Sequence, residues 1–239
     1  MKVAVVTFPG SNCDRDCIYV MRDIFSCEVH NVFHKEASLC DCDAVIIPGG
    51  FSYGDYLRAG ALAKYSPVMK AIQQFAKQGG LVIGICNGFQ ILCEVGLLPG
   101  ALVRNRNVRF ISRNVELRVE NTETAFTSAY EQEQLLWIPI AHAEGNYVAD
   151  DKTIEELESS GRVVFRYTGP KRQDVPDGNP NGSINSIAGI INEQGNVLGM
   201  MPHPERASDE RIGSTDGLGV FRSMITSLQQ DASYAALTV

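Results

Sequence analysis

Four apolar segments in the first hundred residues predict buried strands. The first, KVAVVTF, is apolar or β-branched at nearly every position, which is typical of a strand covered on both faces of a parallel sheet. The predicted strands span residues 2–8, 27–33, 43–50 and 81–85. Helical patterns separate them, and this alternation predicts an α/β fold with a doubly wound, mostly parallel sheet flanked by helices, as in flavodoxin-like proteins.

Three helices are predicted around these strands. Ser11 or Asn12 is suited to cap the first helix, whose first turn would carry acidic side chains. The second is predicted over residues 59–78 and ends at two consecutive glycines. The last is predicted over residues 218–230.

The second half of the chain has a different pattern. Residues 108–121 alternate between apolar and polar side chains, as a half-exposed strand does. Further strands are predicted at 135–146 and 162–169, and a hairpin is predicted to turn at 194–196. We expect these to be additional antiparallel strands of one domain that covers residues 1–239. Residues 169–183 are too rich in Gly, Pro and Asn for regular structure, so we expect a mobile surface loop, with a partner-binding loop as the alternative.

Charge and composition exclude several classes of partner. The formal net charge is −7 and the calculated pI is about 5.1, so no broad basic surface is expected and nucleic acid is not a predicted partner. The apolar run before Pro9 is shorter than that of a signal peptide, so none is expected, and no apolar run approaches the ~18 residues that would span a bilayer. We therefore expect no membrane association and a cytoplasmic location.

The chain has seven cysteines, an odd number that is expected to remain reduced in a protein without a secretory signal. The Cys13–Cys17 and Cys40–Cys42 pairs do not have the spacing of structural zinc sites. No metal site is predicted, and most of these thiols are expected to be small, partly buried apolar side chains.

One cysteine stands apart because glycines flank it. In the segment GICNG, Gly84 and Gly88 lie two residues before and after Cys86. This spacing is that of a nucleophile elbow, a sharp turn from strand to helix that raises a reactive side chain at the carboxyl edge of a sheet. The helix N-terminus would also favour the thiolate. The alternative is a buried cysteine in an ordinary tight turn.

A cysteine nucleophile needs a base, and His203 is the best candidate among the four histidines. Prolines on both sides stiffen its backbone. Glu205, two residues later, can reach the same side of an extended chain and orient the imidazole ring. The alternative is an ordinary proline-rich turn on the surface. His142, at the end of a predicted strand, is a secondary candidate for the wall of the pocket.

Two glycines end the predicted strand segment at 43–50. Gly49 and Gly50 would let backbone N–H groups face the open edge of the sheet, as an oxyanion hole requires. A phosphate-binding loop is the competing interpretation. However, the sequence contains no G-x-x-x-x-G-K-[ST] motif and no G-x-G-x-x-G after its first strand, which disfavours a nucleotide-binding enzyme.

These segments together resemble a known family. PGSNCD, IPGGFSYGDYLRAG, GICNGFQIL, AHAEGN and GNVLGMMPHPERA occur in order from the first predicted strand towards the last predicted helix. They are similar to the class I glutamine amidotransferases, and within them to the glutaminase subunits of phosphoribosylformylglycinamidine synthase. The cysteine and the HPE segment indicate the wider class, whereas PGGFSYGDYLRAG together with CNGFQ is specific to the subunit family.

The resemblance implies a role for nine residues. Cys86 would be the nucleophile, His203 the base and then the acid, and Glu205 its orienting partner. The backbone N–H groups of Gly50 and Asn87 would form the oxyanion hole. The residues implied in binding glutamine are Gly49, Gln90, His142 and Glu144.

The resemblance also implies partners. Ammonia from glutamine would pass to a large synthetase subunit that converts formylglycinamide ribonucleotide to formylglycinamidine ribonucleotide in purine biosynthesis, with a small third subunit in many organisms. ATP and magnesium would serve the synthetase, and no cofactor is expected in this chain. Four arginines could form part of the docking face for these partners: Arg104, Arg106, Arg109 and Arg113. Solvated positions on a strand explain them equally well.

Two other functions are compatible with the same residues. One is a free-standing cysteine hydrolase of this architecture that acts on a γ-glutamyl or peptide substrate. The other is a non-catalytic flavodoxin-like binding module in which Cys86 is only part of the core.

Overall fold

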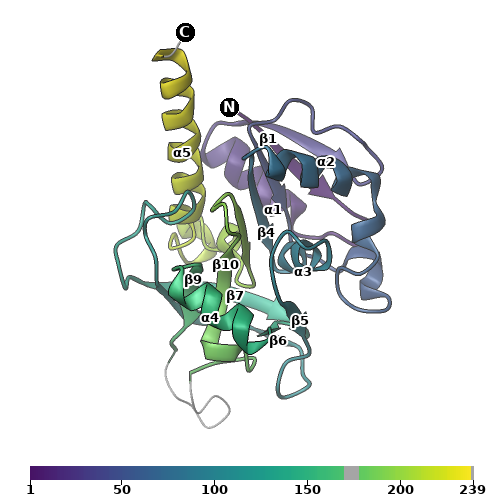
Figure 1. The fold of residues 1–239 in the computed structure, drawn as a ribbon, viewed down its shortest axis with the longest axis vertical. Coiled ribbons are helices and arrows are strands. Elements are labelled where there is room, and N and C mark those ends of the chain that lie inside the picture. The colour runs from purple at the N-terminus through teal and green to yellow at the C-terminus, as the bar shows by residue number, and fades with distance from the viewer. Residues whose placement is uncertain (170–177, 238–239) are drawn as a thin grey trace.

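A nine-stranded sheet runs through the molecule (Figure 1). The structure, a computed structural model, describes residues 1–169 and 178–237, with side chains described as far as residue 230. The strands are β1 (Lys2–Thr7), β2 (Glu28–Phe33), β3 (Ala44–Ile47), β4 (Leu81–Ile85), β5 (Ala101–Val103), β6 (Ile111–Val119), β7 (Leu135–His142), β8 (Asn146–Val148), β9 (Val163–Tyr167), β10 (Ile187–Ile191) and β11 (Val197–Met200). The α-helices are α1 (Asp14–Tyr19), α2 (Pro67–Lys77), α3 (Asn87–Glu94), α4 (Asp151–Ser159) and α5 (Leu218–Leu237).

The order of the large sheet is β2-β1-β3-β4-β11-β10-β9-β6-β7, and β5 and β8 form a separate pair. Strands β2, β1, β3, β4 and β11 are parallel to their neighbours within this group. Beyond β11 every pairing is antiparallel. The predicted doubly wound α/β sheet with antiparallel strands added in the second half is confirmed.

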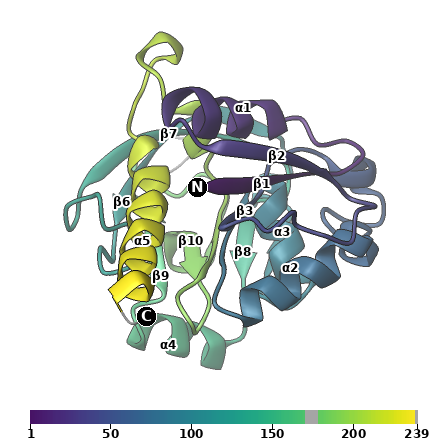
Figure 2. The ribbon, with the colours of Figure 1, turned by 90° about the horizontal axis from the view of Figure 1, so that it is seen from above.

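Helices lie on both faces of the parallel part. Figure 2 shows α1 on one side of β1 and β2, with α2 and α3 on the other side. The last helix, α5, lies beside the antiparallel part and extends away from the body of the molecule towards the C-terminus (Figure 1). Strands β3 and β4 are buried at every residue, which agrees with their continuous apolar sequences.

The predicted elements differ from the structure in several places; for example, β3 ends at Ile47 and not at residue 50. The helix predicted over 59–78 begins only at Pro67, because residues 63–65 form a separate 3-10 turn and Ser66 is extended. The first helix is preceded by Cys13 without a side-chain cap; the hydroxyl of Ser11 instead accepts a hydrogen bond from the Phe8 N–H. Helix α4 and strand β5 were not predicted.

Part of the predicted 169–183 loop is buried. Residues 170–177 lie outside the described residues, so that part of the prediction stays open. The remainder does not form a mobile surface loop: Asn179, Asn181 and Ser183 are all buried. The Asn181 side chain donates a hydrogen bond of 2.8 Å to the carbonyl of Gly145, because these amides satisfy backbone groups of the neighbouring segment.

Strand register decides which segments meet at the carboxyl edge of the sheet. Ile47 of β3 pairs with Gly84 of β4, and Met200 of β11 pairs with Ile85. The chain that follows each of these parallel strands must therefore emerge at the same edge. This register places three segments side by side: residues 48–50, Cys86 and residues 201–205.

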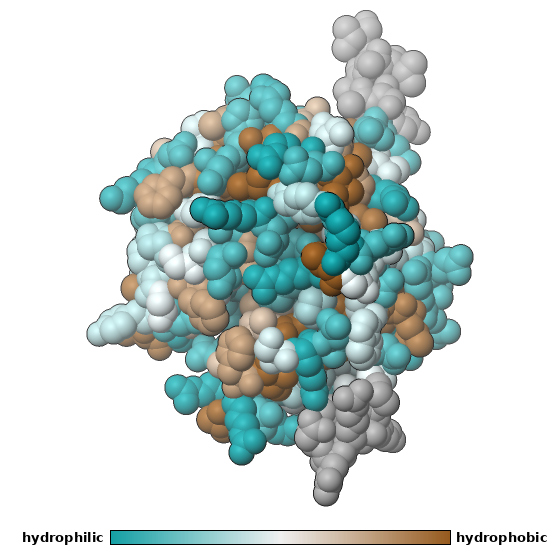
Figure 3. All heavy atoms as spheres, turned by 180° about the vertical axis from the view of Figure 1, so that it is seen from behind, coloured by the Kyte–Doolittle hydropathy of each residue, from teal (hydrophilic) through white to brown (hydrophobic). Residues whose placement is uncertain are grey.

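Outside this edge the surface is ordinary. Seen from behind, hydrophilic side chains cover most of the visible face, with apolar patches scattered between them (Figure 3). Within the described residues, no helix combines the length and the apolar character that crossing a bilayer would need.

Candidate active site

Cys86 lies on a strained turn between β4 and α3. Its φ and ψ are 51° and −104°, a conformation that a residue with a side chain rarely adopts and that often occurs at functional sites. The flanking glycines make the turn possible: a Cβ on Gly88 would lie 2.0 Å from the carbonyl oxygen of Ile47, and one on Gly84 would lie 2.6 Å from the backbone of Gly88. The predicted strand-to-helix turn is therefore present, with the thiol at the edge of the sheet.

His203 and Glu205 form a buried pair. Nδ1 of His203 lies 2.6 Å from Oε1 of Glu205, and both side chains are almost fully buried. Nε2 of His203 has no hydrogen-bond partner among the described residues. Burial alone would lower the pKa of His203, but the carboxylate of Glu205 and the nearby Cys86 thiol raise it well above its ordinary value. The structure thus brings the predicted base and its orienting acid together, close to the predicted nucleophile.

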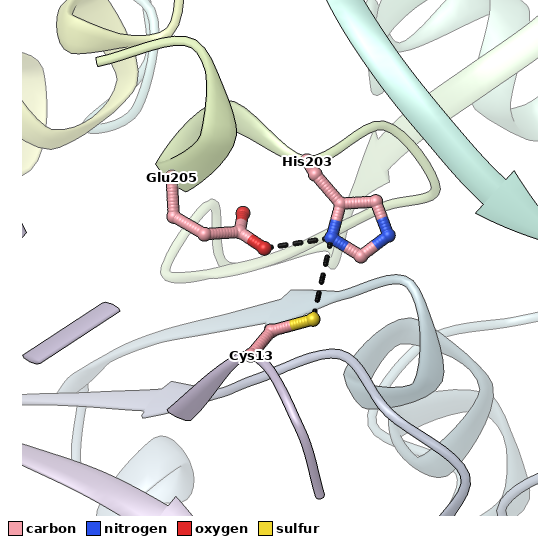
Figure 4. Close-up of side chains that lie close together, drawn as sticks. All are labelled: Cys13, His203 and Glu205. Atoms are coloured by element: carbon pink, nitrogen blue, oxygen red, sulfur yellow. Dashed lines mark hydrogen bonds and ion pairs between the residues drawn. The ribbon is translucent and has the colours of Figure 1, made fainter. Parts of the chain in front are cut away.

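A second thiol lies behind the histidine. Figure 4 shows Nδ1 of His203 between the carboxylate of Glu205 and the thiol of Cys13, whose Sγ is 3.8 Å away. Arg206 donates a hydrogen bond of 3.1 Å to the same sulfur, and burial raises the pKa of the Cys13 thiol. Cys13, His203 and Glu205 form a group that could hold a metal ion, because their potential ligand atoms all lie within 4.8 Å of one another. The sequence alone indicated no metal site at the Cys13–Cys17 pair and no contact of Cys13 with the predicted base.

The two glycines after β3, Gly49 and Gly50, have different surroundings. A Cβ on Gly49 would lie 2.7 Å from Cε1 of His203 and 3.0 Å from Sγ of Cys13, so Gly49 leaves room for the histidine ring. Gly50 has φ of 150°, and a Cβ there would lie 2.7 Å from the backbone of Ser11. Of the two, only Gly50 lines the cavity beside Cys86.

That cavity contains most of the predicted substrate residues. It encloses about 60 Å³ beside the Cys86 thiol. Its other predicted members are Gly50, Gln90, His142 and Glu144, and the four members that were not predicted are Phe51, Asp55, Ala141 and Ala143. Because a nucleophilic thiol and several polar groups converge on one recess, this cavity is the candidate substrate site.

A chain of side-chain hydrogen bonds joins three segments around the cavity. Asn87 accepts a hydrogen bond of 3.1 Å from the Ser52 N–H and donates one of 2.9 Å to Gln90. Gln90 in turn donates to the carbonyl of Glu144 at 2.6 Å. The amide side chains thereby lock the loop after β3 and the loop after β7 against the start of α3.

Asn105 determines which ring nitrogen of His142 carries the proton. The Nδ2 group of Asn105 donates to the carbonyls of Arg109 and His142, at 2.8 and 2.9 Å. Its Oδ1 therefore faces Nδ1 of His142 at 3.0 Å and also accepts from the Gly145 N–H. Nδ1 must carry the proton, which leaves Nε2 as an acceptor.

Nε2 of His142 is buried and has no partner among the described residues. Burial and the positive charge of His203 lower the pKa of His142 to about 3, so the ring is neutral near pH 7. A neutral buried acceptor in the wall of the cavity is suited to receive a hydrogen bond from a ligand. Asn105, which the sequence analysis missed, is the residue that creates it.

This arrangement has the components of an acyl-transfer site. A thiol lies at a helix N-terminus, near an imidazole that is held by a buried carboxylate, and a cavity opens beside the thiol. Backbone N–H groups in the first turn of a helix have no intrahelical acceptors, so they can stabilise a developing oxyanion.

Comparison with known proteins identifies the family. Residues 1–216 match the CobB/CobQ-like glutamine amidotransferase domain. The chain is 55% identical over 228 residues to the phosphoribosylformylglycinamidine synthase subunit PurQ of Acaryochloris marina, covering 95% of this chain and 97% of that protein. The subunit PurQ of Koribacter versatilis is 55% identical over 225 residues, covering 94% and 97%.

A solved structure agrees with the sequence relatives. A chain in the structure of PurLQS from Thermotoga maritima superimposes with a TM-score of 0.84 at 46% identity, covering 95% of this chain and 98% of that one. The agreement extends over both the parallel and the antiparallel part of the sheet. The chain belongs to the glutamine amidotransferase family and, within it, to the PurQ subunits of phosphoribosylformylglycinamidine synthase.

Proposed function

We propose that this chain is a glutaminase that supplies ammonia to the synthetase subunit of phosphoribosylformylglycinamidine synthase, for the conversion of formylglycinamide ribonucleotide to formylglycinamidine ribonucleotide. The observation that carries the proposal is the meeting of Cys86 with the buried His203–Glu205 pair at one edge of the sheet. The PurQ relatives, which match along nearly the whole chain, supply the reaction.

In the proposed mechanism, the thiolate of Cys86 attacks the side-chain carboxamide of glutamine. The backbone N–H groups of Gly50 and Asn87 stabilise the tetrahedral oxyanion. His203, oriented by Glu205, donates a proton to the departing ammonia and then takes one from the water that hydrolyses the γ-glutamyl thioester. The raised pKa of His203 suits the first step, because the ring starts with the proton that ammonia needs.

The wall of the cavity holds the substrate. His142 is proposed to accept a hydrogen bond from glutamine through Nε2, its buried acceptor without a partner among the described residues. Gln90 and Glu144 are proposed to shape the cavity through the hydrogen bond that joins them. Gly49 contributes indirectly, since only a glycine leaves space for the ring of His203.

Exposed apolar side chains near the cavity support docking of a partner. The ring centroids of Phe51 and Phe110 lie 6.3 Å apart, and Phe51 also lines the cavity. Tyr56, Leu57 and Val108 are each at least 70% exposed. Apolar side chains of this kind, gathered at a site, are typical of interaction surfaces. We propose that the partners are a synthetase subunit and a small third subunit, in line with the name PurLQS of the similar solved structure.

Three other properties belong to the proposal. ATP and magnesium serve the synthetase, and this chain uses no cofactor of its own. Residues 1–239 form a single glutaminase domain, which the one sheet shared by both halves supports. The location is cytoplasmic, in agreement with seven cysteines that are all free thiols.

The test is glutamate release from glutamine by the isolated chain and by the chain mixed with the synthetase and the small subunit, ATP, magnesium and formylglycinamide ribonucleotide. We expect slow hydrolysis by the isolated chain and a clear increase in the complete mixture. Replacement of Cys86 by alanine is the control and should remove both activities. Equal rates with and without the partners would instead favour a free-standing cysteine hydrolase.

A further inference from the structure

A strained loop directs one carboxylate into the cavity. The loop after β3 has positive φ at Tyr53 (55°), Gly54 (67°), Asp55 (52°) and Leu57 (73°). Left-handed backbone is unfavourable for residues with side chains and persists where the surroundings enforce it, often for a functional reason. The result here is that Asp55 lines the same cavity as Cys86.

The carboxylate of Asp55 has no cation beside it in the described part of the chain. Its one hydrogen bond comes from Nδ2 of Asn87, at 3.5 Å. The second acid of the cavity, Glu144, has more partners. Its carboxylate accepts a hydrogen bond of 3.2 Å from the Ala59 N–H and lies 3.9 Å from the guanidinium group of Arg104. Burial and the negative charge of Glu144 raise the pKa of Asp55 to about 6. The cavity therefore contains an acid whose negative charge is not compensated by a cation among the described residues.

Another lining residue of the cavity, His142, has the opposite preference. His142 is neutral and lies near enough to the positively charged His203 for that charge to lower its pKa. A cationic group of a ligand is thus disfavoured beside His142 and favoured beside Asp55. Glutamine offers one cation, its α-ammonium group, together with the carboxamide that must reach Cys86.

We propose that Asp55 binds the α-ammonium group of glutamine and makes the site specific for a free amino acid. This proposal rests on the proposed glutaminase function, since it names the group that recognises the substrate of that reaction. Peptides linked through the α-nitrogen, and amides that lack this nitrogen, would leave the half-buried carboxylate of Asp55 without a cation, and that costs binding energy.

The test compares two reagents that alkylate the nucleophile. One is 6-diazo-5-oxonorleucine, which carries an α-ammonium group, and the other is the same diazoketone acid without that group. The rate of Cys86 labelling is followed by mass spectrometry in the intact chain, in Asp55→Asn, in Glu144→Gln as the matched acid, and in Cys86→Ala as the blank. Thermal melting of each variant checks its fold.

Asp55→Asn should slow labelling by the amino reagent about 10- to 100-fold, as expected for loss of a hydrogen bond between charged groups. Labelling by the reagent without the α-ammonium group should not change. Glu144→Gln should affect both reagents to the same extent. In the assembled enzyme, Asp55→Asn should raise KM for glutamine by a similar factor and change kcat much less.

Three results would overturn the proposal. Equal slowing of both reagents by Asp55→Asn would mean that Asp55 only supports the cavity. A loss confined to the amino reagent in Glu144→Gln would assign the ammonium group to Glu144. Failure of the unaltered chain to react with either reagent would refute the glutaminase function itself, and this result is distinguishable because it appears before any substitution is made.

Discussion

The two halves of the sheet build the site in different ways. In the parallel half, backbone geometry positions the reacting groups: β4 ends in the turn of Cys86, and β11 leads into the segment of His203. In the antiparallel half, side-chain hydrogen bonds position the wall of the cavity, chiefly through Asn105 and Asn181. Strand ends thus position the catalytic residues, and a network of amide side chains positions the wall of the substrate cavity. Changes at the ends of β4 and β11 should therefore affect the chemical step, and changes among the amides of the antiparallel half should affect binding.

The largest effect is expected at the end of β4. Cys86→Ala removes the nucleophile and only one weak hydrogen bond, from its sulfur to the carbonyl of Ala141, so glutamine hydrolysis should fall by roughly 10⁴-fold or more while the fold is kept. Steady-state glutamate release and circular dichroism measure the two properties. Cys40→Ser is the matched control, because Cys40 is exposed, and it should hydrolyse glutamine normally. Substantial turnover by Cys86→Ala would reject the assigned nucleophile.

A smaller effect is expected when the support of His203 is removed. Glu205→Gln replaces the carboxylate that raises the pKa of His203, so kcat should fall roughly 10²- to 10⁴-fold. Burial would then act on the ring with less compensating charge and lower its pKa. The limb of the pH–rate profile at which His203 loses its proton should consequently move to lower pH. A profile that keeps its position in Glu205→Gln would contradict the role given to the pair.

The raised pKa of His203 also makes the stability of the fold depend on pH. Because the pKa of His203 is raised in the folded chain, its contribution to stability is fully present below the pKa of an unfolded histidine, about 6.5. This contribution is lost as the pH rises through the folded value. Glu205→Gln should therefore reduce the free energy of unfolding more at pH 6 than at high pH. Urea unfolding at several pH values measures the difference, and an equal loss at every pH would contradict it.

The smallest effect on catalysis is expected in the antiparallel half. Asn105→Ala leaves the His142 ring and the Gly145 N–H without their acceptor, so KM for glutamine should rise about 10-fold and the free energy of unfolding should fall by about 2 kcal/mol. Asn114→Ala, at an exposed position of β6, is the control and should change neither. If Asn105→Ala lowered kcat and left KM unaltered, the division between the two halves would be wrong.

Local patterns in the sequence predicted the parallel half well. The continuous apolar segments became β1, β3 and β4, and the glycine spacing around Cys86 became the strained turn. The helix over 59–78 was predicted too long because a helical composition continues through residues that the structure folds as turns. Tertiary contacts overrode the local preference there.

The supporting residues of the site could not be predicted in this way. Asn105 and the ring of His142 are 37 positions apart, and Cys13 is 190 positions from His203. Asparagine in a loop and cysteine after a strand have many ordinary explanations, so neither residue type indicates its partner. Asp55 was likewise only one acid in a glycine-rich loop until the cavity showed what it faces.

The sequence by itself determined the strands, the turn that exposes Cys86 and the motifs of the family, because periodicity and glycine placement act over a few neighbouring residues. The tertiary structure decided which segments meet. Pairing of β11 with β4 brings His203 to Cys86, and packing around the cavity sets the tautomer of His142 and the pKa values of His142 and Asp55. These properties depend on burial and on neighbours distant in the chain, and only the folded arrangement supplies both.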